Sequence, residues 1–489
     1  MPLLSSKAKK PPTIRIEKVA IRPPPRPKPR PSLSHRTPSS SSAKASPSSR
    51  PSPNPRLLPR DSASPYPSSS DERRRKRKLP SVDPVTQWGR DDSDSDGADD
   101  DFVQSLDMAK RQRRGDSERT DESRSLVAAD AYEGQWPKEL KYIHARAVMN
   151  TSSPAKPAQR ALKAKPDDDI RVRIQYPSLY LPESYELLVE NGTIDAVSDI
   201  LKVVNHVAYF YLTEEQATPF TDKEHGLIRR LERTSRTNEL ADFKLALKEA
   251  NGVIRRLAQD GTFRKNLDRK HGAPRDLVEF ILAQVYDRTV SPDVEKLKQY
   301  TNGTDNVYGE LKHVFISKIL QEKTHMTSDQ VFVDLGSGVG NVVFQAALEI
   351  GCESWGCEMM DNPCDFAVAQ QDEFQKRCRL WGLSPGKVSL VRGDFLKDES
   401  IHAVLKRADV VLVNNQAFTP QLNDKLAYMF LDLKPGCKIV SLKSFLHADG
   451  VRNTNDVVRN ILDVEQNTFP EDHVSWTNNG GEFYVSTRK

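Results

Sequence analysis

The sequence predicts an α/β fold with a doubly wound parallel sheet in its last third, and three observations support this prediction. The string VFVDLGSGVGN (residues 331–341) begins as a short apolar strand, ends the strand in an acid and turns through three glycines. Apolar residues then recur at helical spacing from Val342 to Ile350, so this helix would pack back on the sheet. Further strand-like and helical segments alternate downstream, as parallel α/β topology requires. In such a fold the ligand binds beyond the carboxyl ends of the strands.

The glycine-rich turn separates two classes of ligand. A dinucleotide fingerprint, Gly-x-Gly-x-x-Gly, counted from Gly336 would need its third glycine at position 341, where this chain has Asn341. Asp334 stands two residues before the first glycine, and its carboxylate would repel a pyrophosphate but suit an ammonium group. S-adenosyl-L-methionine (SAM) has an amino-acid end, a sulfonium cation and no phosphate. A SAM-binding turn is therefore favoured over a dehydrogenase turn, and over a plain glycine turn with a solvated aspartate.

Acids follow the next two expected strands at positions that suit a nucleoside. SWGCE ends at Glu358, which is placed to accept hydrogen bonds from ribose hydroxyls. KVSLVRGDF ends at Asp394 and Phe395, an acid and a ring that suit the amino group and the face of an adenine. Two more strands are expected in ADVVLVNNQAF and KIVSLKSF, and the arms of VSWTNNGGEFYVST would form a hairpin around Asn-Asn-Gly-Gly. This order predicts a class I SAM-dependent methyltransferase fold, which is a Rossmann-like seven-stranded sheet with a C-terminal hairpin.

Composition divides the 489 residues into three parts. Residues 1–155 are rich in Ser, Pro, Arg and Lys and poor in aromatic residues, which predicts a long, disordered basic tail. Residues 156–306 are expected to be a mainly helical N-terminal part of the catalytic region, and residues 307–489 the SAM-binding methyltransferase domain. The apolar face of one expected helix comprises Phe243, Leu247, Ala250, Ile254 and Leu257.

Charge along the chain indicates a polyanionic partner. The formal net charge is +5, and the run RRRKRK (residues 73–78) and a second basic cluster (residues 110–114) are typical of nuclear import or of nucleic-acid contact. The acidic run between them (residues 91–101) is interpreted as a solvated segment. Arginines on the helical part form either a solvated face or a contact to a phosphate surface. They are Arg229, Arg230, Arg233, Arg236, Arg255 and Arg256.

Composition also disfavours several classes of protein. The five cysteines include no Cys-x-x-Cys pair, so we expect neither a zinc ribbon nor a disulfide framework, and free thiols suit a reducing compartment. No apolar run reaches the length of a membrane helix, and the polar N-terminus lacks a signal-peptide core. We therefore expect a soluble intracellular protein without a membrane partner.

Five motifs in order resemble those of one family. VYGE (residues 307–310), VDLGSGVGN, RGDF, LVNNQAF and VSWTNNGGEFY are similar to those of the disruptor-of-telomeric-silencing family, the histone H3 lysine-79 N-methyltransferases that lack a SET domain. The resemblance covers residues 160–489 and is strongest to the fungal type. A DNA-adenine methyltransferase is disfavoured because NNQAF lacks the proline-containing motif of those enzymes. The remaining alternative is a SAM-binding chromatin protein with little or no turnover.

The resemblance implies a nuclear chromatin regulator that transfers methyl groups from SAM to lysine 79 of histone H3 in nucleosomes, with roles in telomeric silencing and the DNA damage checkpoint. It implies no metal cofactor. The implied partners are the nucleosome, with its DNA bound through the basic tail, and ubiquitinated histone H2B.

The resemblance also implies roles for individual residues. The cofactor would be lined by Tyr308, Gly309, Glu310, Leu311, Phe332, Val333, Asp334, Leu335, Gly336, Ser337, Gly338, Val339, Gly340, Asn341, Glu358, Asp394 and Phe395. The catalytic set would be Tyr308, Asn414, Trp476 and Phe483, with Tyr484 as a further wall of a narrow lysine channel. This chain departs from the family at Phe483, which is usually tyrosine, and at Gln416, which is usually phenylalanine.

Overall fold

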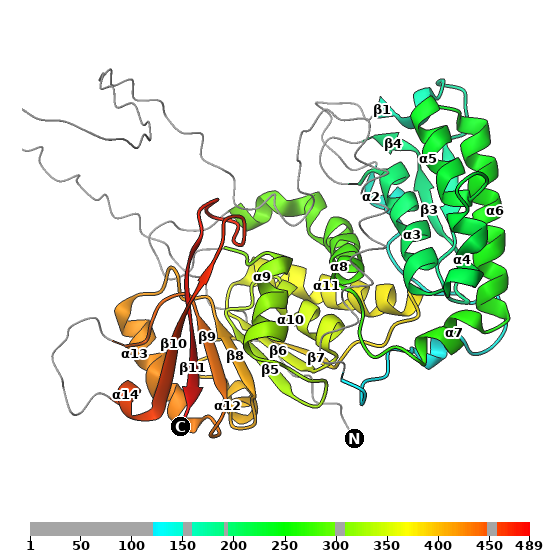
Figure 1. Ribbon diagram of the computed structural model, residues 1–489. Coiled ribbons are helices and arrows are strands. Elements are labelled where there is room, and N and C mark those ends of the chain that lie inside the picture. Colours follow the sequence, from blue (N-terminus) through cyan, green and yellow to red (C-terminus); the bar gives the residue numbers. More distant parts are fainter. Residues whose placement is uncertain (1–120, 150–158, 190–193, 299–308, 447–456) are drawn as a thin grey trace, which may run out of the picture. The chain divides into compact units, whose positions relative to one another are not determined.

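The computed structural model describes residues 121–149, 159–189, 194–298, 309–446 and 457–489 (Figure 1). The basic runs of the predicted tail, and Val307 and Tyr308 of the expected cofactor loop, lie outside these residues. None of the helices in the described ranges is long and apolar enough to cross a membrane.

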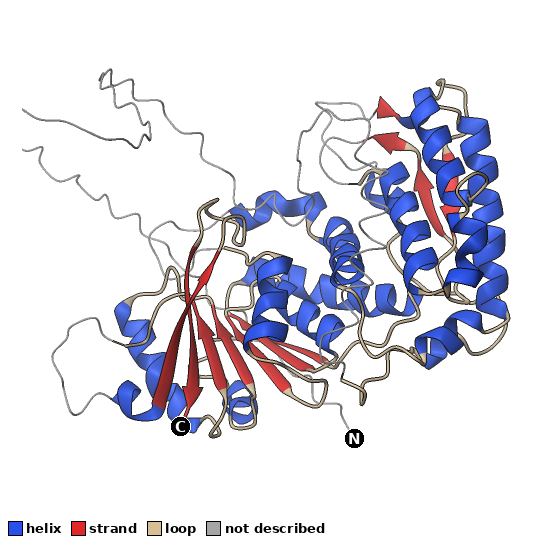
Figure 2. Cartoon of the chain, viewed as in Figure 1, coloured by secondary structure: helices blue, strands red, loops and turns tan. Residues whose placement is uncertain are grey.

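A seven-stranded sheet, drawn in red in Figure 2, organises the C-terminal part. Its strand order is β10-β11-β9-β8-β5-β6-β7, as labelled in Figure 1. Its parallel strands are β5 (Val331–Leu335), β6 (Glu353–Glu358), β7 (Val388–Arg392), β8 (Val410–Val413) and β9 (Lys438–Ser441). Because β5 lies between β6 and β8, the chain winds outward from it in two directions, and in open sheets of this kind ligands bind beyond the carboxyl ends of the strands at such a point. The predicted fold class is confirmed.

The antiparallel edge of the sheet confirms the expected terminal hairpin but not its first arm. β10 (Leu462–Phe469) pairs with β11 (Gly481–Arg488), and β11 pairs with β9. The arm expected around Val474 is not in the sheet, because Val474 forms a bridge with Leu311 instead. The Asn-Asn-Gly-Gly sequence suggested a short local turn, whereas the whole of residues 470–480 lies between the two strands.

Helices cover both faces of the sheet. Apolar side chains of α9, α10 and α11 pack with those of Phe332 and Val440, whereas α12, α13 and α14 pack with Val333 and Val411. The first set is α9 (His313–Ser317), α10 (Asn341–Gln345) and α11 (Asp361–Leu380), and α9 and α10 continue as the π-helical turns η4 (Lys318–Lys323) and η5 (Ala346–Ile350). The second set is α12 (Glu399–Leu405), α13 (Pro420–Met429) with η6 (Phe430–Asp432), and α14 (Val457–Ile461).

The part before the sheet is mainly helical, as expected, with four short strands. Its main helices are α3 (Ala196–Phe210), α4 (Glu214–Thr221), α5 (Leu227–Thr237), α6 (Leu240–Gln259), α7 (Thr262–Leu267), α8 (Arg275–Thr289) and η3 (Ser291–Lys298). Its strands are β1 (Gln159–Arg160), β2 (Arg171–Ile174), β3 (Glu183–Glu186) and β4 (Leu188–Val189). The predicted apolar face of α6 is buried, apart from Leu257, which is only partly buried.

Ordered packing begins earlier than the sequence predicted. The predicted tail extended to residue 155, but the described residues 121–149 include η1 (Ala129–Ala131), α2 (Ala145–Met149) and a fully buried Leu126. Val127 pairs with Leu383, which directly follows α11. Composition did not predict that this segment is ordered, because its apolar partners lie more than 200 residues further along the chain.

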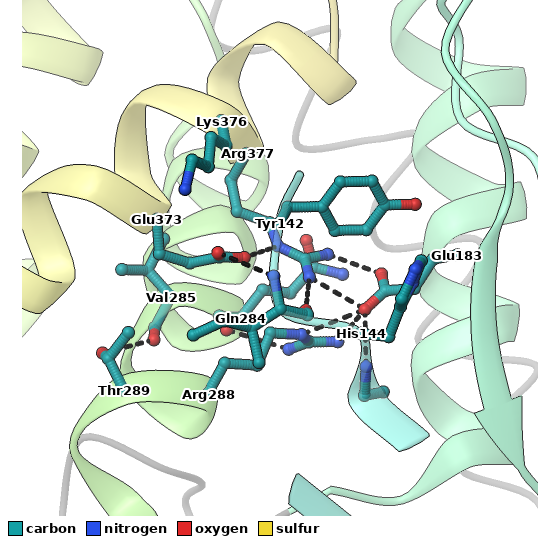
Figure 3. Close-up of polar contacts among 12 residues, drawn as sticks. Tyr142, His144, Glu183, Gln284, Val285, Arg288, Thr289, Glu373, Lys376 and Arg377 are labelled. Atoms are coloured by element: carbon teal, nitrogen blue, oxygen red, sulfur yellow. Dashed lines mark hydrogen bonds and ion pairs between the residues drawn. The ribbon is translucent and has the colours of Figure 1, made fainter. Parts of the chain in front are cut away.

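A buried cluster of charged side chains joins β3 to α8 and α11 (Figure 3). Glu183 accepts hydrogen bonds from Nη2 of Arg377 at 2.8 Å and from Nε of Arg288 at 3.1 Å. Arg377 also donates to Oε1 of Glu373 at 2.7 Å and to the carbonyl of Ile143 at 2.6 Å. Burial by itself would raise the pKa of Glu183, but the two guanidiniums outweigh it and hold that pKa well below its usual range.

Candidate active site

The candidate site lies at the carboxyl end of β5, where the chain turns into α10. Gly336 and Gly340 have φ angles of 91° and 93°, in the left-handed region that favours glycine. The amides of Gly336 and Ser337 both donate to the carbonyl of Cys357, at 2.9 Å and 3.0 Å, which ties the turn to β6. The turn predicted from the sequence is therefore present, and its backbone is held in place from the neighbouring strand.

Two carboxylates lie beside this turn. Asp334 is 3% exposed, and burial together with the charge of Glu358 raises the pKa of its carboxyl to about 8. Within the described ranges, no residue donates a hydrogen bond to the side-chain carboxylate of Asp334 or forms an ion pair with it. Glu358 accepts hydrogen bonds from the amides of Gly338 at 3.0 Å and of Met359 and Met360 at 2.8 Å each. A buried carboxylate beside a second carboxylate suits a cationic ligand, so these two acidic side chains fit SAM.

An acid and two aromatic rings form the next part of the site. Asp394 accepts a hydrogen bond from the amide of Leu396 at 3.0 Å and pairs with Lys397 at 2.8 Å. The Phe395 ring lies 6.4 Å from the Phe418 ring at an interplanar angle of 29°. A Cβ atom added to Gly336 would be 3.9 Å from Cζ of Phe418, so Phe418 lies directly over the glycine turn. This arrangement suits the amino group and the face of an adenine.

The expected cofactor loop pairs with the segment before β11. The amide of Glu310 donates to Oγ of Ser475 at 2.9 Å, and the amide of Ser475 donates to the carbonyl of Glu310 at 2.9 Å. The amide of Lys312 donates to the carbonyl of His473 at 3.0 Å. Residues 309–312 and 473–476 therefore form a short antiparallel ladder, which fixes the cofactor loop against the expected lysine channel.

Gly309, Asn414 and Trp476 meet at the end of this ladder. Nδ2 of Asn414 donates to the carbonyl of Gly309 at 3.1 Å. A Cβ atom added to Gly309 would lie 2.8 Å from Cε3 of Trp476, so the indole packs directly on the bare backbone. The structure thus brings together three residues that the sequence placed on separate motifs.

Other predicted site residues lie elsewhere. Phe483 is fully buried in the core, with its ring 5.2 Å from that of Phe315, because it points inward from β11. It packs in the apolar cluster against which Trp476 also packs, and its place in the wall of the lysine channel stays a prediction. Tyr484 points to the opposite face and donates to Glu482 at 3.2 Å, and Gln416 is exposed.

Side chains of β5 itself face the core. Phe332, Val333 and Leu335 are fully buried in the apolar clusters on the two faces of the sheet. Leu311 and Val339 are likewise buried at 2% and 1% exposure. These residues set the position of the strand and loops, whereas Asp334 is the one residue of β5 that presents a charged group.

Cysteines and metal ligands add no further site. All five cysteines are buried and free, as expected from their spacing. In the part of the chain that the structure describes, no three His, Cys, Asp or Glu side chains are grouped as a metal ion would require.

Three residues at the site were missed by sequence reasoning. Phe418 follows the fourth parallel strand and could have been found from its place at a strand end. Gln370 lies on the apolar face of α11 with Phe366 and Phe374. A polar residue on such a face is unusual, so the sequence could have indicated that Gln370 has a special position. Ser475 gives no signal, because its partner Glu310 is 165 residues away.

The seven-stranded sheet, with its glycine turn after β5 and with the buried Asp334 and the half-buried Glu358 beside that turn, defines a class I SAM-dependent methyltransferase. The family model "Histone methylation protein DOT1" matches residues 286–488. The chain belongs to this DOT1 family. A histone-lysine N-methyltransferase, H3 lysine-79 specific, from Gibberella zeae is 57% identical and aligns with 98% of this chain and 97% of its own length. A protein of the same description from Chaetomium globosum is 51% identical and aligns with 78% of this chain and 74% of its own length.

Solved structures give a weaker match. An RNA methyltransferase from Salinibacter ruber in complex with S-adenosyl-L-homocysteine is 21% identical, covers 37% of this chain and 94% of its own, and has a TM-score of 0.26. A match at this level adds nothing to the family assignment.

Proposed function

We infer that this chain is a histone-lysine N-methyltransferase that transfers methyl groups from SAM to lysine 79 of histone H3. Membership of the DOT1 family and near-full-length similarity to relatives of that description support this function. The structural observation that carries it is the contact of the cofactor loop, at Gly309, with both Asn414 and Trp476. Methyl transfer requires donor and acceptor groups to meet at one point, and these contacts bring the two expected binding sites together.

We propose the following roles for the cofactor residues. Asp334 accepts the ammonium end of SAM, because its buried carboxyl has no other cation beside it among the described residues. Glu358, already fixed by three backbone amides, accepts the ribose hydroxyls. Asp394 and Phe395 hold the adenine, with Phe418 as a second ring. When bound, SAM supplies a methyl group that is activated by its sulfonium charge.

Asn414 is proposed to orient the lysine amine. Because Nδ2 of Asn414 is committed to the carbonyl of Gly309, Oδ1 is left to accept an N–H of the incoming amine. The Trp476 indole excludes water from one side of this point. A lysine amine has a pKa near ~10.4 in water, and an aromatic surface beside a cationic sulfonium lowers it. Water takes the proton of the lysine ammonium. The neutral amine would then form a bond to the methyl carbon as the bond from that carbon to sulfur breaks and S-adenosylhomocysteine leaves.

His473 is not proposed as the base. Its Nδ1 is hydrogen-bonded to the carbonyl of Glu471 at 2.9 Å, and its ring packs against Phe469 and Phe315. Positioning and desolvation therefore account for most of the proposed rate enhancement.

The function is tested with labelled SAM and three acceptors in parallel: intact nucleosomes, free histone H3 and naked DNA. We expect label on nucleosomal H3 at lysine 79 and none on DNA. Asn414→Ala should bind SAM normally but lose at least about tenfold in kcat, as expected for loss of an orienting hydrogen bond. SAM binding without labelling of any acceptor would favour the alternative of a chromatin-binding protein with little turnover.

Nucleosomal DNA is proposed as a partner, with the protein acting in the nucleus. Basic runs at residues 73–78 and 110–114 support this proposal. Helix α5 adds the exposed side chains of Arg229, Arg233 and Arg236. Arg255 and Arg256 of α6 line a hollow of about 510 Å³ together with Arg230 of α5, whose guanidinium is already paired with Glu249 of the same lining. Guanidiniums bind phosphate oxygens with two parallel hydrogen bonds, so this surface suits a DNA backbone.

A pair of double variants tests this surface. Arg229→Gln with Arg233→Gln should weaken nucleosome binding and reduce the slope of log affinity against log salt by about 2. Lys387→Gln with Lys406→Gln removes the same charge from exposed positions outside α5 and α6 and should change neither. Equal losses in both variants would indicate a general effect of net charge. Comparing unmodified nucleosomes with nucleosomes ubiquitinated on H2B tests the last proposed partner.

A further inference from the structure

Gln370 lies in the middle of α11 and is 2% exposed. Its Nε2 donates to the carbonyl of Val339 at 2.8 Å and to Oδ1 of Asn341 at 3.1 Å. Val339 belongs to the turn between β5 and α10, and Asn341 is the first residue of α10. A buried amide is costly unless it is hydrogen-bonded, and a leucine would fill a similar volume without that cost. The position of Gln370 therefore calls for an explanation beyond packing.

The contact with Gln370 determines which way the Asn341 amide points. Because Oδ1 of Asn341 accepts from Gln370, its Nδ2 faces the cofactor loop and donates to Oε1 of Glu310 at 3.1 Å. The reversed amide would place an oxygen against the Glu310 carboxylate, which is unfavourable. Asn341 and Glu310 are themselves only 7% and 6% exposed, so the contact is shielded from water.

Glu310 is thus held from two directions. Its backbone is paired with Ser475 on the side of the expected lysine channel. Its side chain is held through Asn341 and Gln370 on the side of the glycine turn and α11. The sequence placed Glu310 and Asn341 among the cofactor residues but gave no role to Gln370.

We propose that Gln370 is a positioning residue for the cofactor site: through Asn341 it sets the Glu310 carboxylate in the orientation that SAM binding requires. The inference rests on the proposed function in taking Glu310 as a SAM-binding residue. It adds a residue on a helix that is not expected to touch the cofactor.

The test replaces Gln370 by leucine and compares it with a matched neighbour. Gln371 is half-buried on the same helix, and its Nε2 donates to the carbonyl of Val388 on β7 at 3.1 Å. Gln370→Leu should weaken SAM binding, measured by direct titration without histone, by about tenfold, as expected when one buried hydrogen bond to a positioning group is lost. Its KM for SAM should rise by the same factor, whereas kcat at saturating SAM and KM for nucleosomes should stay within about twofold. Gln371→Leu should leave SAM affinity unchanged.

A double variant separates positioning from packing. If Gln370 acts through Asn341, then Asn341→Ala should weaken SAM binding, and adding Gln370→Leu to it should cause no further loss. Gln370→Met keeps the volume of the side chain and should reproduce the loss of affinity if the leucine variant does not fold. Unchanged SAM affinity in a folded Gln370 variant, or additive losses in the double variant, would overturn the proposal. Wild-type protein that binds SAM but labels no nucleosome would refute the proposed function and leave this test intact.

Discussion

Two buried groups of charged side chains in this chain are balanced in opposite ways. Around Glu183, two acids face two guanidiniums, and every charge has an opposite charge within hydrogen-bond distance (Figure 3). At the end of β5, the buried Asp334 faces another acid, Glu358, and its pKa is raised to about 8. Asp334 is almost as buried as the Glu183 cluster, although Glu358 beside it is only half-buried, and only the Glu183 cluster is complete without a ligand.

The difference distinguishes a structural cluster from a binding site. Removing charges from water is costly, and the cost is offset only where opposite charges and hydrogen bonds replace the water. In the Glu183 cluster, opposite charges and hydrogen bonds replace the water. The cluster therefore needs no ligand and serves to join β3 to α8 and α11. Asp334 lacks it, so the protein retains an uncompensated buried acid that a cationic cofactor can stabilise.

Among the variants that test this comparison, Glu183→Gln is expected to have the largest effect. The variant leaves Arg288 and Arg377 buried with a single acid, and removing one partner of a buried ion pair costs about 3–5 kcal/mol of stability. The thermal midpoint should fall clearly, whereas SAM affinity measured below that midpoint should not change. Glu186→Gln on the same strand is the control, because its partner Arg146 is 45% exposed and such pairs contribute less than about 1 kcal/mol. Equal destabilisation by both variants would contradict the special role of the buried cluster.

Asp334→Asn should have the opposite pattern. Loss of the carboxylate should weaken SAM binding by about 10- to 100-fold, which corresponds to one charge-assisted hydrogen bond. Stability without SAM should be unchanged or higher at pH 7.5 and above, because asparagine carries no charge to bury. Titration with SAM and thermal unfolding in its absence measure the two quantities. A less stable variant that keeps its SAM affinity would show that Asp334 is a structural acid.

The pH dependence of SAM binding sharpens the same contrast. Since the folded-state pKa of Asp334 is raised to about 8, its contribution to stability without SAM is lost as the pH rises from its usual pKa toward 8. A cation beside Asp334 favours the ionised form, so SAM binding should release a proton, and affinity should rise by up to about tenfold per pH unit between pH 6 and 8. Calorimetry at pH 7 in two buffers of different ionisation enthalpy measures this proton, and Asp334→Asn should release correspondingly less. The sign is reversed for Glu183, whose lowered pKa makes its contribution disappear in acid.

The smallest effect is expected from Phe418→Leu. The variant keeps an apolar side chain over the glycine turn but removes the ring that faces Phe395. Aromatic contacts of this kind contribute about 0.5–1.5 kcal/mol beyond the area they bury, so SAM affinity should fall by roughly two- to tenfold. Tyr428→Leu is the control, since Tyr428 on α13 is 63% exposed. No difference between the two variants would remove Phe418 from the site.

The sequence alone was enough to predict those parts of the site whose position depends on the order of strands and helices along the chain. In a parallel sheet, the residue after each strand necessarily lies at the same edge, so Asp334, Glu358 and Asp394 could be placed from strand ends alone. The sheet and its terminal hairpin followed from the same alternation of strands and helices.

Features that depend on distant partners could not be predicted in this way. Val474 looked like a hairpin arm, but its partner is Leu311, far earlier in the chain. The burial of the Phe483 ring depends on its packing against Phe315, which lies far earlier in the chain. The segment from residue 121 was expected to be disordered, because its backbone partners Leu383 and Ser384 lie beyond α11, far later in the chain.

The ladder between residues 309–312 and 473–476 has a consequence for how binding of SAM and binding of the lysine would influence each other. One strand of the ladder carries the cofactor loop and the other carries Trp476, so whatever immobilises one strand immobilises the other. If the proposed function holds, the two binding events should be coupled, and by thermodynamic reciprocity SAM would tighten binding of the lysine by the same factor as the lysine tightens binding of SAM. The amides of Lys312 and Ser475 should accordingly gain protection from hydrogen exchange together, with either ligand alone.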